Sequence, residues 1–549
     1  MTTQSPDGPA APTYLEHARR DWGGLAIWDY LRYDDEGELW INDLRVSDAA
    51  ARYGTPLEIV DTTIVERRAT EWVALSRAVA AEVGYPGRLR YLYAAKANLA
   101  SEITHAAYRS GWGAETSALQ DLEHLEWMAD HGLVRRDIRV VCNGFKLPAG
   151  CYGWPSDTRH AGRALGAGST PGSGATGPTS GAGAADRIRL PELRDHMPAR
   201  GMTYADRIVA LARAGWDITP VLDEGELDTF LDPSVPPMKV GVRLKFGPVA
   251  TRAELDGLVS RFGMLPPAVA ATAGRIAASG HLTFTTLHAM AGSAEGIPID
   301  AYVAAFALAG RIWAELRRDH PTLSELNTGG GMPPLGDAYD HRAFLRGFFR
   351  SLASASAAAE VPPPDVTFEL GNLIAAESGF HVFKVLQHRR NHAPVPDGVD
   401  DWALVDGGLM AAIPDMLLIH KPFRCLSARH AHAPASRVRL GDLTCDSDGR
   451  YPPKAFTDAP GIWLPDAPGN NFVVIQGVGA YQEILAGVRG AHHCGLLEAI
   501  ELILERGADG VVRGRLMPRQ TAADAARLLG YTAVAADALA RTRPSDHDR

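Results

Sequence analysis

The stretch YLYAAKAN, residues 91–98, places a lysine directly after a short apolar run. Lysine side chains usually lie in solvent, so Lys96 at the end of a buried strand requires either a special partner or the loss of its charge. From this stretch to about residue 385, apolar runs alternate with amphipathic helical segments. The expected strands are GRLRYLYAAK, GWGAE, IRVVCNG, ITPVLD, MKVGVRLKF, LTFTTLHAM, LSELNTGGG and DVTFEL. Seven or eight such units in about 330 residues predict an α/β fold with a parallel (β/α)8 barrel.

Changes in composition divide the chain into segments. Residues 1–13 are polar with three prolines and are expected to be disordered. Residues 14–54 are expected to contribute to a second domain, and residues 55–384 to form the barrel. Within that range, segment 162–186 is rich in Gly, Ser, Ala and Pro, which predicts a flexible inserted loop. Residues 385–549 are expected to form an antiparallel β domain with C-terminal helices.

The prediction of the second domain depends on short strand-like runs separated by Gly, Pro and Asp turns. These runs are DDWALVDGG, RVRLGDLTCD, GIWLPD and NNFVVIQGVGAY. The segments CGLLEAIELILERG and TAADAARLLGYTAVAADAL are expected to follow them as helices.

The composition of the chain disfavours several classes of protein. A net charge of -10 disfavours a nucleic-acid partner, because phosphate binding needs a basic face. No run of 18 apolar residues predicts a membrane span, and the N-terminus lacks the pattern of a signal peptide, so we expect a cytoplasmic protein. The five cysteines contain no CxxC pair, and we expect neither a disulfide framework nor a metal site.

Several polar or glycine residues follow the expected barrel strands. Barrels of this kind place their chemistry at the C-terminal ends of the strands, so these residues are expected to meet at one mouth. They are Lys96, Glu115, Asn143, His288, Gly329, Gly330, Gly331 and Glu369.

This set of residues suits a phosphorylated carbonyl cofactor. A desolvated lysine has a lowered pKa and can form an imine with a carbonyl group. Three consecutive glycines let backbone N–H groups approach a phosphate, and a glutamate keeps a pyridine nitrogen protonated. Pyridoxal phosphate needs all three features. Each one alone is weak, since three glycines after a strand more often form a tight turn and a strand-end glutamate is usually solvated or paired.

The order of these motifs resembles a known family. YAAKAN, GAETS, SRFG at 260–263, GGG and ELGNLIAAESG occur as in the fold-type III pyridoxal-phosphate decarboxylases, which act on diaminopimelate, ornithine and arginine. GDLTCDSDG at 441–449 and GVGAYQEILAG at 477–487 are similar to the biosynthetic arginine decarboxylase branch, as are CNGFK and GGLMAAIPD. The resemblance implies an alanine-racemase-like barrel and covers the chain from about residue 38 to about residue 500.

The resemblance also implies roles for individual residues. Lys96 is expected to be the Schiff-base lysine, and Glu369 to pair with the pyridine nitrogen. Cys445 is expected to return a proton to the substrate carbon after CO2 leaves, although a buried structural thiol is the alternative. The phosphate is expected to be held by Gly329, Gly330, Gly331 and Tyr481, and the distal cation of the substrate to face Asp446 and Asp448.

The resemblance extends to cofactor and assembly. It implies pyridoxal 5'-phosphate as the cofactor and leaves a requirement for Mg2+ open. It implies a head-to-tail homodimer, in which the CDSDG loop of one subunit completes the site of the other, and leaves higher oligomers open.

The sequence departs from the family at two positions of the expected site. Asn372 in ELGN stands where the family has an arginine that reaches the phosphate, so a charge-assisted contact is lost. The family also has a histidine two residues before GS, stacked on the cofactor ring, and HAMAGS places Met290 there with His288 two residues earlier. We favour His288 as the stacking residue, with Met290 as the alternative.

These observations predict decarboxylation of a cationic L-amino acid, with arginine or an arginine derivative first and a role in polyamine metabolism. One alternative is a decarboxylase with a shifted substrate: ornithine, lysine, diaminopimelate or an amino acid of specialised metabolism. Another is a non-catalytic relative that regulates an active paralogue, which the retention of Lys96, Glu369, Cys445 and Tyr481 disfavours. A racemase shares the barrel, but the CDSDG and GAYQE motifs disfavour it.

Overall fold

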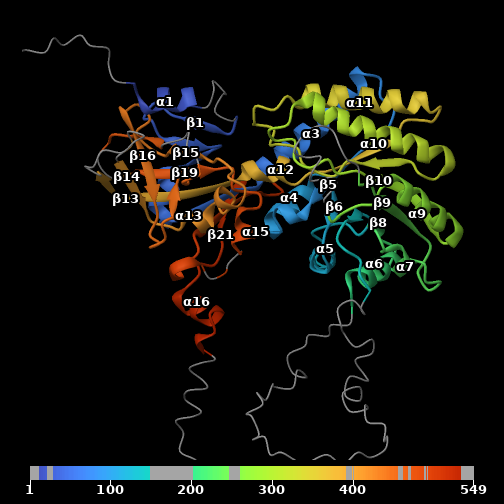
Figure 1. The fold of residues 1–549 in the computed structure, drawn as a ribbon. Coiled ribbons are helices and arrows are strands. Elements are labelled where there is room, and N and C mark those ends of the chain that lie inside the picture. Colours follow the sequence, from blue (N-terminus) through green and yellow to red (C-terminus); the bar gives the residue numbers. More distant parts are fainter. Residues whose placement is uncertain are drawn as a thin grey trace, which may run out of the picture.

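The protein consists of a barrel domain and a sheet domain that lie side by side (Figure 1). Residues 1–11 of the segment 1–13 predicted to be disordered, and the predicted flexible segment 162–186, lie outside the described residues, whereas Thr13 is described and forms an isolated bridge with Pro434. The computed structural model describes residues 12–21, 29–148, 202–245, 260–390, 399, 401–455, 461–467, 471–487, 490 and 492–532.

Eight parallel strands form the closed barrel, and each overlaps one of the eight predicted runs, with β6 and β8 each extending one residue beyond its run. The barrel closes where β12 pairs with β5, in register from Val366 opposite Leu89. Buried side chains on both strand faces explain why these runs read as continuously apolar. The prediction of the barrel is therefore confirmed. Its strands are β5 (Leu89–Ala94), β6 (Gly113–Thr116), β7 (Arg139–Cys142), β8 (Asp217–Leu222), β9 (Met238–Arg243), β10 (Leu282–His288), β11 (Glu325–Asn327) and β12 (Asp365–Glu369).

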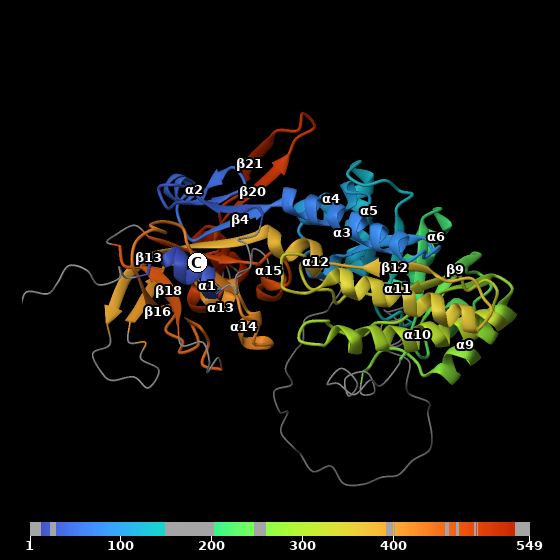
Figure 2. The ribbon, with the colours of Figure 1, turned by 90° about the horizontal axis from the view of Figure 1, so that it is seen from above.

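Helices cover the outside of the barrel (Figures 1 and 2). Their apolar side chains recur at helical spacing, as Tyr302, Phe306 and Trp313 do along α10. This face packs against α11, where the ring centroids of Phe306 and Phe348 lie 5.4 Å apart. The helices of this domain are α3 (Thr62–Glu82), α4 (Ser101–Arg109), α5 (Leu119–Asp130), α6 (Tyr204–Arg213), α7 (Leu227–Phe230), α9 (Pro266–Ser279), α10 (Ile299–Asp319), α11 (His341–Ala358) and α12 (Asn372–Ala375).

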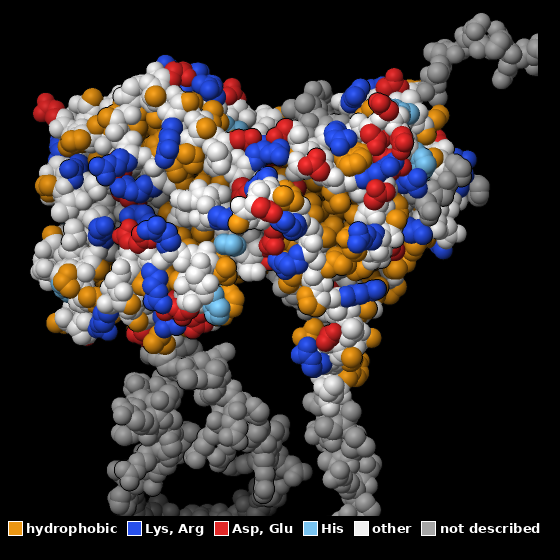
Figure 3. All heavy atoms as spheres, turned by 180° about the vertical axis from the view of Figure 1, so that it is seen from behind, with side chains coloured by type: hydrophobic (Ala, Val, Ile, Leu, Met, Phe, Trp, Pro, Cys, Tyr) orange, Lys and Arg blue, Asp and Glu red, His pale blue; other side chains and the backbone are white. Residues whose placement is uncertain are grey.

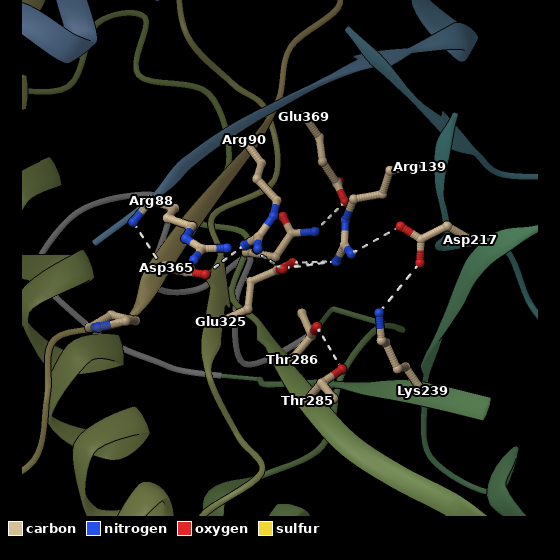
Figure 4. Close-up of polar contacts among 12 residues, drawn as sticks. Arg88, Arg90, Arg139, Asp217, Lys239, Thr285, Thr286, Glu325, Asp365 and Glu369 are labelled. Atoms are coloured by element: carbon tan, nitrogen blue, oxygen red, sulfur yellow. Dashed lines mark hydrogen bonds and ion pairs between the residues drawn. The ribbon is translucent and has the colours of Figure 1, made fainter. Parts of the chain in front are cut away.

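Paired charges occupy the amino-terminal ends of the barrel strands (Figure 4). Glu325 accepts two hydrogen bonds from Arg139, at 3.0 and 2.8 Å, and one from Arg90 at 3.3 Å. Arg90 also donates to Asp365 at 3.0 Å, and Arg139 lies 3.8 Å from Asp217. Since these residues stand at or near the start of their strands, the network crosses this end of the barrel. The opposite end is where such barrels place their chemistry.

The second domain is built on a ten-stranded mixed sheet. Leu39 and Ile41 of the N-terminal segment share an apolar core with Phe380 and Val474 of this sheet. The N-terminal segment contains α1 (Tyr14–Asp21), β1 (Leu31–Tyr33), β2 (Leu39–Ile41), β3 (Leu44–Arg45) and α2 (Val46–Tyr53). The strands of the large sheet are β4 (Leu57–Asp61), β13 (Gly379–Arg390), β14 (Asp401–Val405), β15 (Arg424–Ser427), β16 (Ala435–Gly441), β17 (Arg450–Tyr451), β18 (Ile462–Pro465), β19 (Phe472–Gln476), β20 (Ile500–Arg506) and β21 (Val512–Leu516).

The structure corrects three details of the predicted second domain. The sheet is mixed rather than antiparallel, because β14 pairs with β16 and β4 with β20 in parallel. Both β4 and the start of β13 belong to this sheet, although residues 55–384 were expected to form the barrel. The segment CGLLEAIELILERG forms β20 and not a helix. Its apolar residues are buried between β4 and β21, and a short apolar run does not distinguish a strand from a helix.

The remaining C-terminal prediction agrees with the structure where it is described, since α16 (Ala522–Leu528) lies within the second predicted helix. Seen from the side drawn in Figure 3, hydrophobic side chains gather on the sheet domain above α16, whereas charges of both signs are scattered over the barrel. Among the described helices, none is both long and apolar enough to cross a membrane.

Candidate active site

A cavity of about 240 Å³ lies between the carboxyl ends of the barrel strands and the sheet domain. The helices α12 and α15 (Gln482–Ala486) stand between the two domains in this region (Figure 1). Both domains supply lining residues, so the cavity exists only when the domains are in contact. The lining residues with polar or glycine character are Lys96, Ser293, Glu295, Gly330, Gly331, Glu369, Gly371, Asn372, Asp415, Lys421 and Tyr481.

Lys96 lies in the single turn η1 (Ala95–Ala97) that follows β5. Its two alanine neighbours are buried, and the lysine side chain, 53% exposed, lines the cavity with its Nζ atom 3.9 Å from Glu115 Oε2. The charge of Glu115 raises the pKa of Lys96 and outweighs the opposing effect of burial. The expectation of a lowered lysine pKa is therefore wrong for the protein by itself, because a carboxylate stabilises the ammonium group.

Glu369 ends β12 with its carboxylate held on both oxygens. Oε1 accepts from Asn327 Nδ2 at 2.6 Å, and Oε2 accepts from Asn143 Nδ2 at 2.7 Å and His288 Nε2 at 3.3 Å. Burial acts to raise the pKa of Glu369, but His288, Lys96 and Asn327 together lower it below its ordinary value. A fixed carboxylate anion therefore faces the cavity.

The structure separates the two candidates for the stacking residue. His288 is 2% exposed, hydrogen bonds Glu369, and is not among the described residues that line the cavity. Met290 does line the cavity. Burial lowers the pKa of His288, so the ring is neutral and can donate from Nε2 to the Glu369 carboxylate. The geometry places His288 behind Glu369 and Met290 at the cavity wall.

The three glycines after β11 leave no room for side chains. Gly329 has φ +63°, and a Cβ atom there would lie 2.6 Å from Met290 Sδ. Gly331 has φ +97°, and a Cβ atom there would lie 2.1 Å from the carbonyl oxygen of Gly292. A Cβ atom on Gly330 would meet the carbonyl oxygen of Glu369 at 2.5 Å. The loop therefore presents backbone alone to the cavity, through Gly330 and Gly331.

Tyr481 of the sheet domain and Asn372 at the start of α12 complete the cavity wall. The backbone N–H of Tyr481 donates to Ala97 O at 2.6 Å, which joins the sheet domain to the turn that carries Lys96. Asn372 begins α12, and its buried Oδ1 atom has no hydrogen-bond partner among the described residues.

The residues present fit pyridoxal phosphate. The glycine loop tolerates no side chain and presents backbone to the cavity, and a lysine and a fixed carboxylate share that cavity with it. The glycine loop suits the phosphate of the cofactor, Lys96 suits its aldehyde, and Glu369 suits its pyridine nitrogen.

The residues expected to serve the substrate lie elsewhere in the same chain. Cys445, Asp446 and Asp448 are absent from the described residues that line the cavity. The exposed Cys445 Sγ lies 3.9 Å from Cys494 Sγ, and Asp448 Oδ1 lies 3.1 Å from Lys454 Nζ. No three His, Cys, Asp or Glu residues in the described ranges are grouped to hold a metal ion.

Sequence reasoning missed four polar residues of the cavity, one of which is Glu295. Asp415 and Lys421 come from the sheet domain, and Ser293 follows β10. Ser293 belongs to the AGS sequence, so its place after a strand was a usable signal. Nothing in the sequence alone places Lys421 next to a barrel strand end.

Comparison with solved structures shows which proteins share this architecture. The biosynthetic arginine decarboxylase of Campylobacter jejuni superposes with a TM-score of 0.68 at 16% identity, covering 97% of this chain and 94% of that one. Diaminopimelate decarboxylase of M. jannaschii, in complex with L-lysine, superposes with a TM-score of 0.66 at 15% identity, and the match covers 90% of this chain and 96% of that one. The chain has the fold of the fold-type III pyridoxal-phosphate decarboxylases. The lysine/ornithine decarboxylase of Vibrio vulnificus, in complex with putrescine, superposes with a TM-score of 0.53 at 16% identity, and the match covers 80% of this chain and 93% of that one.

Sequence comparison adds a more local similarity to these decarboxylases. A stretch of 97 residues is 31% identical to diaminopimelate decarboxylase of Vibrio cholerae. It spans 18% of this chain and 21% of that protein, about a fifth of its length. No protein-family model matches the chain.

Proposed function

We propose that this protein is a pyridoxal-phosphate-dependent decarboxylase of a cationic L-amino acid, with arginine or an arginine derivative as the first candidate. The observation that carries the proposal is the placement of Lys96, Glu369 and the glycine loop around one cavity. The fold shared with the arginine and diaminopimelate decarboxylases supports it. When bound, pyridoxal phosphate supplies the electron sink for the electrons released as the substrate carboxylate leaves.

Lys96 and Glu115 act as a pair in this proposal. Lys96 is the amine positioned for the cofactor aldehyde, but it must lose a proton before it can act as a nucleophile. Glu115 Oε2 lies 3.9 Å away, and burial raises the pKa of Glu115 above its ordinary value. Glu115 is therefore suited to accept that proton.

Glu369 is proposed to hold the proton of the pyridine nitrogen. Its oxygens are fixed by Asn327 and Asn143, so the carboxylate needs little rearrangement to accept a hydrogen bond from a cation. His288 is a positioning residue in this arrangement, because its Nε2 atom contacts Glu369 while its ring lies outside the cavity lining. Met290 is the proposed neighbour of the cofactor ring, where a thioether makes favourable contacts with aromatic systems.

The phosphate is proposed to lie against the backbone of the glycine loop and the side chain of Tyr481. Gly330 and Gly331 present their backbone to the cavity, and Tyr481 reaches it from the sheet domain. Contacts from both domains orient the cofactor relative to Lys96 and exclude water from the reacting groups.

Substrate recognition is proposed to involve a second copy of the chain. Cys445, Asp446 and Asp448 lie outside the cavity of their own subunit, so a head-to-tail homodimer is needed to bring them to a cavity. Paired carboxylates suit a guanidinium or ammonium group, and Cys445 can then supply the proton that replaces CO2. Leu418 and Ile419 are 63% and 66% exposed, and Ile419 lines the cavity, which supports an apolar contact beside the site.

The shifted-substrate alternative is favoured by the two departures inside the cavity, Met290 and Asn372. Both alter the surroundings of the proposed cofactor and leave its attachment residues in place. The two departures therefore favour a decarboxylase with an altered substrate preference, rather than a protein without catalytic activity.

The test is mass spectrometry of the purified protein, incubated with pyridoxal phosphate and single amino acids, with and without Mg2+. The panel includes arginine, ornithine, lysine, diaminopimelate and hydroxylated or N-modified arginines. A product lighter by one CO2 is expected from one cationic substrate. Bound cofactor without any product excludes these substrates, and the absence of bound cofactor favours the regulatory alternative. Light scattering of the same sample measures whether a dimer forms.

A further inference from the structure

The cavity contains a cation that neither the resemblance nor the comparisons assign. Among the described residues that line it, the only cationic side chains are Lys96 and Lys421. A phosphate group carries close to two negative charges at neutral pH and is bound best where a cation faces it. Lys96 already has Glu115 as its ion-pair partner and lies beside Glu369. Lys421 is therefore the available counter-charge.

A hydrogen-bonded unit fixes Lys421 at the cavity together with Tyr481. Lys421 follows α14 (Asp415–Leu418), and its backbone N–H donates to Asp415 O at 3.0 Å. The Asp415 side chain accepts from Gln482 Nε2 at 2.8 Å, and the Asp415 N–H donates to Gln482 Oε1 at 3.2 Å. Gln482 is the residue next to Tyr481. Lys421 and Tyr481, two of the residues that the sheet domain supplies to the cavity, therefore share one anchor.

The ammonium group of Lys421 is free to take an anionic partner. Within the described residues it forms no ion pair, its charge acts to lower the pKa of Asp337, and its Nζ atom lies 5.3 Å from the centroid of the Phe423 ring. Two acidic residues, Glu295 and Asp415, also line the cavity, but the Asp415 carboxylate is bound to Gln482. An ammonium group over an aromatic ring can still donate hydrogen bonds to an anion.

Asn372 contributes no charge to the cavity. It stands where the resembled family has its phosphate arginine, and its neutral amide leaves a buried Oδ1 atom without a partner in the described part of the chain. Both Asn372 and Lys421 line the same cavity as the glycine loop. The position that lacks the arginine charge, Asn372, and the lysine that could replace that charge, Lys421, therefore lie at one site. The two residues come from different domains.

We propose that Lys421 binds the phosphate of the cofactor and replaces the cationic contact that Asn372 does not provide. This inference rests on the proposed function, because it requires pyridoxal phosphate in the cavity. It predicts that the sheet domain supplies both a hydroxyl group, from Tyr481, and a charge to the phosphate.

The test compares two ligands that differ only in the phosphate. Protein stripped of cofactor is titrated with pyridoxal phosphate and with pyridoxal, and binding is followed by absorbance. Lys421→Met is expected to weaken binding of pyridoxal phosphate by about tenfold to a hundredfold, the size of one charge-assisted contact, and to leave pyridoxal binding unchanged. Lys421→Arg is expected to retain the wild-type affinity.

A second variant distinguishes phosphate binding from a structural role. Asn372→Arg, added to Lys421→Met, is expected to restore most of the lost affinity for pyridoxal phosphate. Lys384→Met, which removes a half-buried lysine of β13 outside the cavity lining, is the matched control and is expected to change neither affinity.

The outcomes separate the inference from the function on which it rests. Unchanged affinity in Lys421→Met, or equal losses for both ligands, overturns the inference while the proposed function stands. Failure of the wild-type protein to bind pyridoxal phosphate overturns both.

Discussion

The two ends of the barrel carry similar residues in different states. Strand β11 begins with Glu325, which Arg139 and Arg90 neutralise, and the neighbouring β12 ends with Glu369, which faces the cavity. At the mouth, the buried atoms Glu115 Oε2 and His288 Nδ1 lack hydrogen-bond partners among the described residues. In the described charge network at the amino-terminal end, the buried atom without a hydrogen-bond partner is Arg139 Nε.

The difference indicates what each end contributes. A buried charge that is paired inside the protein is costly to disturb and holds the fold in place. Buried polar atoms without partners are also costly, and they are retained where a ligand or a reaction uses them. Mutations at the amino-terminal end should therefore change stability, and mutations at the mouth should change binding or turnover.

The largest effect is expected from Glu369→Gln at the mouth. The substitution keeps the shape of the side chain but removes the anion proposed to hold the pyridine proton. Turnover should fall on the order of a hundredfold, the size of one preorganised electrostatic contact, with a smaller change in cofactor affinity. Steady-state kinetics and a cofactor titration measure the two quantities. Equal turnover in Glu369→Gln and wild type would remove Glu369 from the mechanism.

The matched change at the other end is Glu325→Gln. It removes the nearer carboxylate partner of Arg139 and leaves only Asp217 at 3.8 Å, so the free energy of unfolding should fall by about 3 kcal/mol. Turnover of the folded protein at low temperature should stay within about twofold of wild type, because Glu325 lies at the amino-terminal end of its strand and is not among the described residues that line the cavity. Urea unfolding and kinetics on the same sample provide the comparison, and a large loss of turnover without destabilisation contradicts it.

A smaller effect is expected in the pH dependence of stability. Burial lowers the pKa of His288 below its ordinary value of 6.5, so below that pH the unfolded chain binds the proton more readily than the folded one. This group therefore destabilises the fold as the pH falls through 6.5 toward its folded pKa. His288→Gln should make the decline in unfolding free energy below pH 6.5 shallower.

The control for this experiment is His381→Gln in the sheet domain. Burial lowers the pKa of His381 to about 4, so its removal should also make the same decline shallower. Only His288→Gln should also change turnover, because His288 orients Glu369. A His288→Gln variant with wild-type turnover would limit His288 to a role in stability.

The smallest effect is expected from Met290→Ala at the cavity wall. Loss of a thioether–ring contact is worth about 0.3–1.5 kcal/mol, which lowers cofactor affinity up to about tenfold. Met290→His, which introduces the residue of the resembled family, should restore the affinity. If Met290→Ala binds the cofactor as wild type does, Met290 is not the neighbour of the ring.

The sequence predicted the barrel and the strand-end residues because both depend on local pattern. Apolar runs locate the strands, and Lys96, Glu369 and the glycines follow them directly. It predicted less where a contact depends on distant parts of the chain. Lys421 reaches the cavity through Asp415 and Gln482, and no periodicity indicates that connection.

Two further differences between the sequence predictions and the structure also arise from contacts between distant parts of the chain. The pKa of Lys96 is raised because Glu115 comes from the adjacent strand β6, and strand pairing is not visible in a local motif. The run that forms β20 is buried between β4 and β21, so its burial on both faces hid the alternation typical of a strand.

The most direct test of the account is to trap the cofactor on the protein. Protein loaded with pyridoxal phosphate is reduced with borohydride, digested, and searched by mass spectrometry for the modified lysine. The account predicts the label on Lys96, and no labelled cavity peptide in Lys96→Ala. A label on Lys421, or an unchanged label in Lys96→Ala, would contradict the claim that Lys96 at the barrel mouth is the attachment residue.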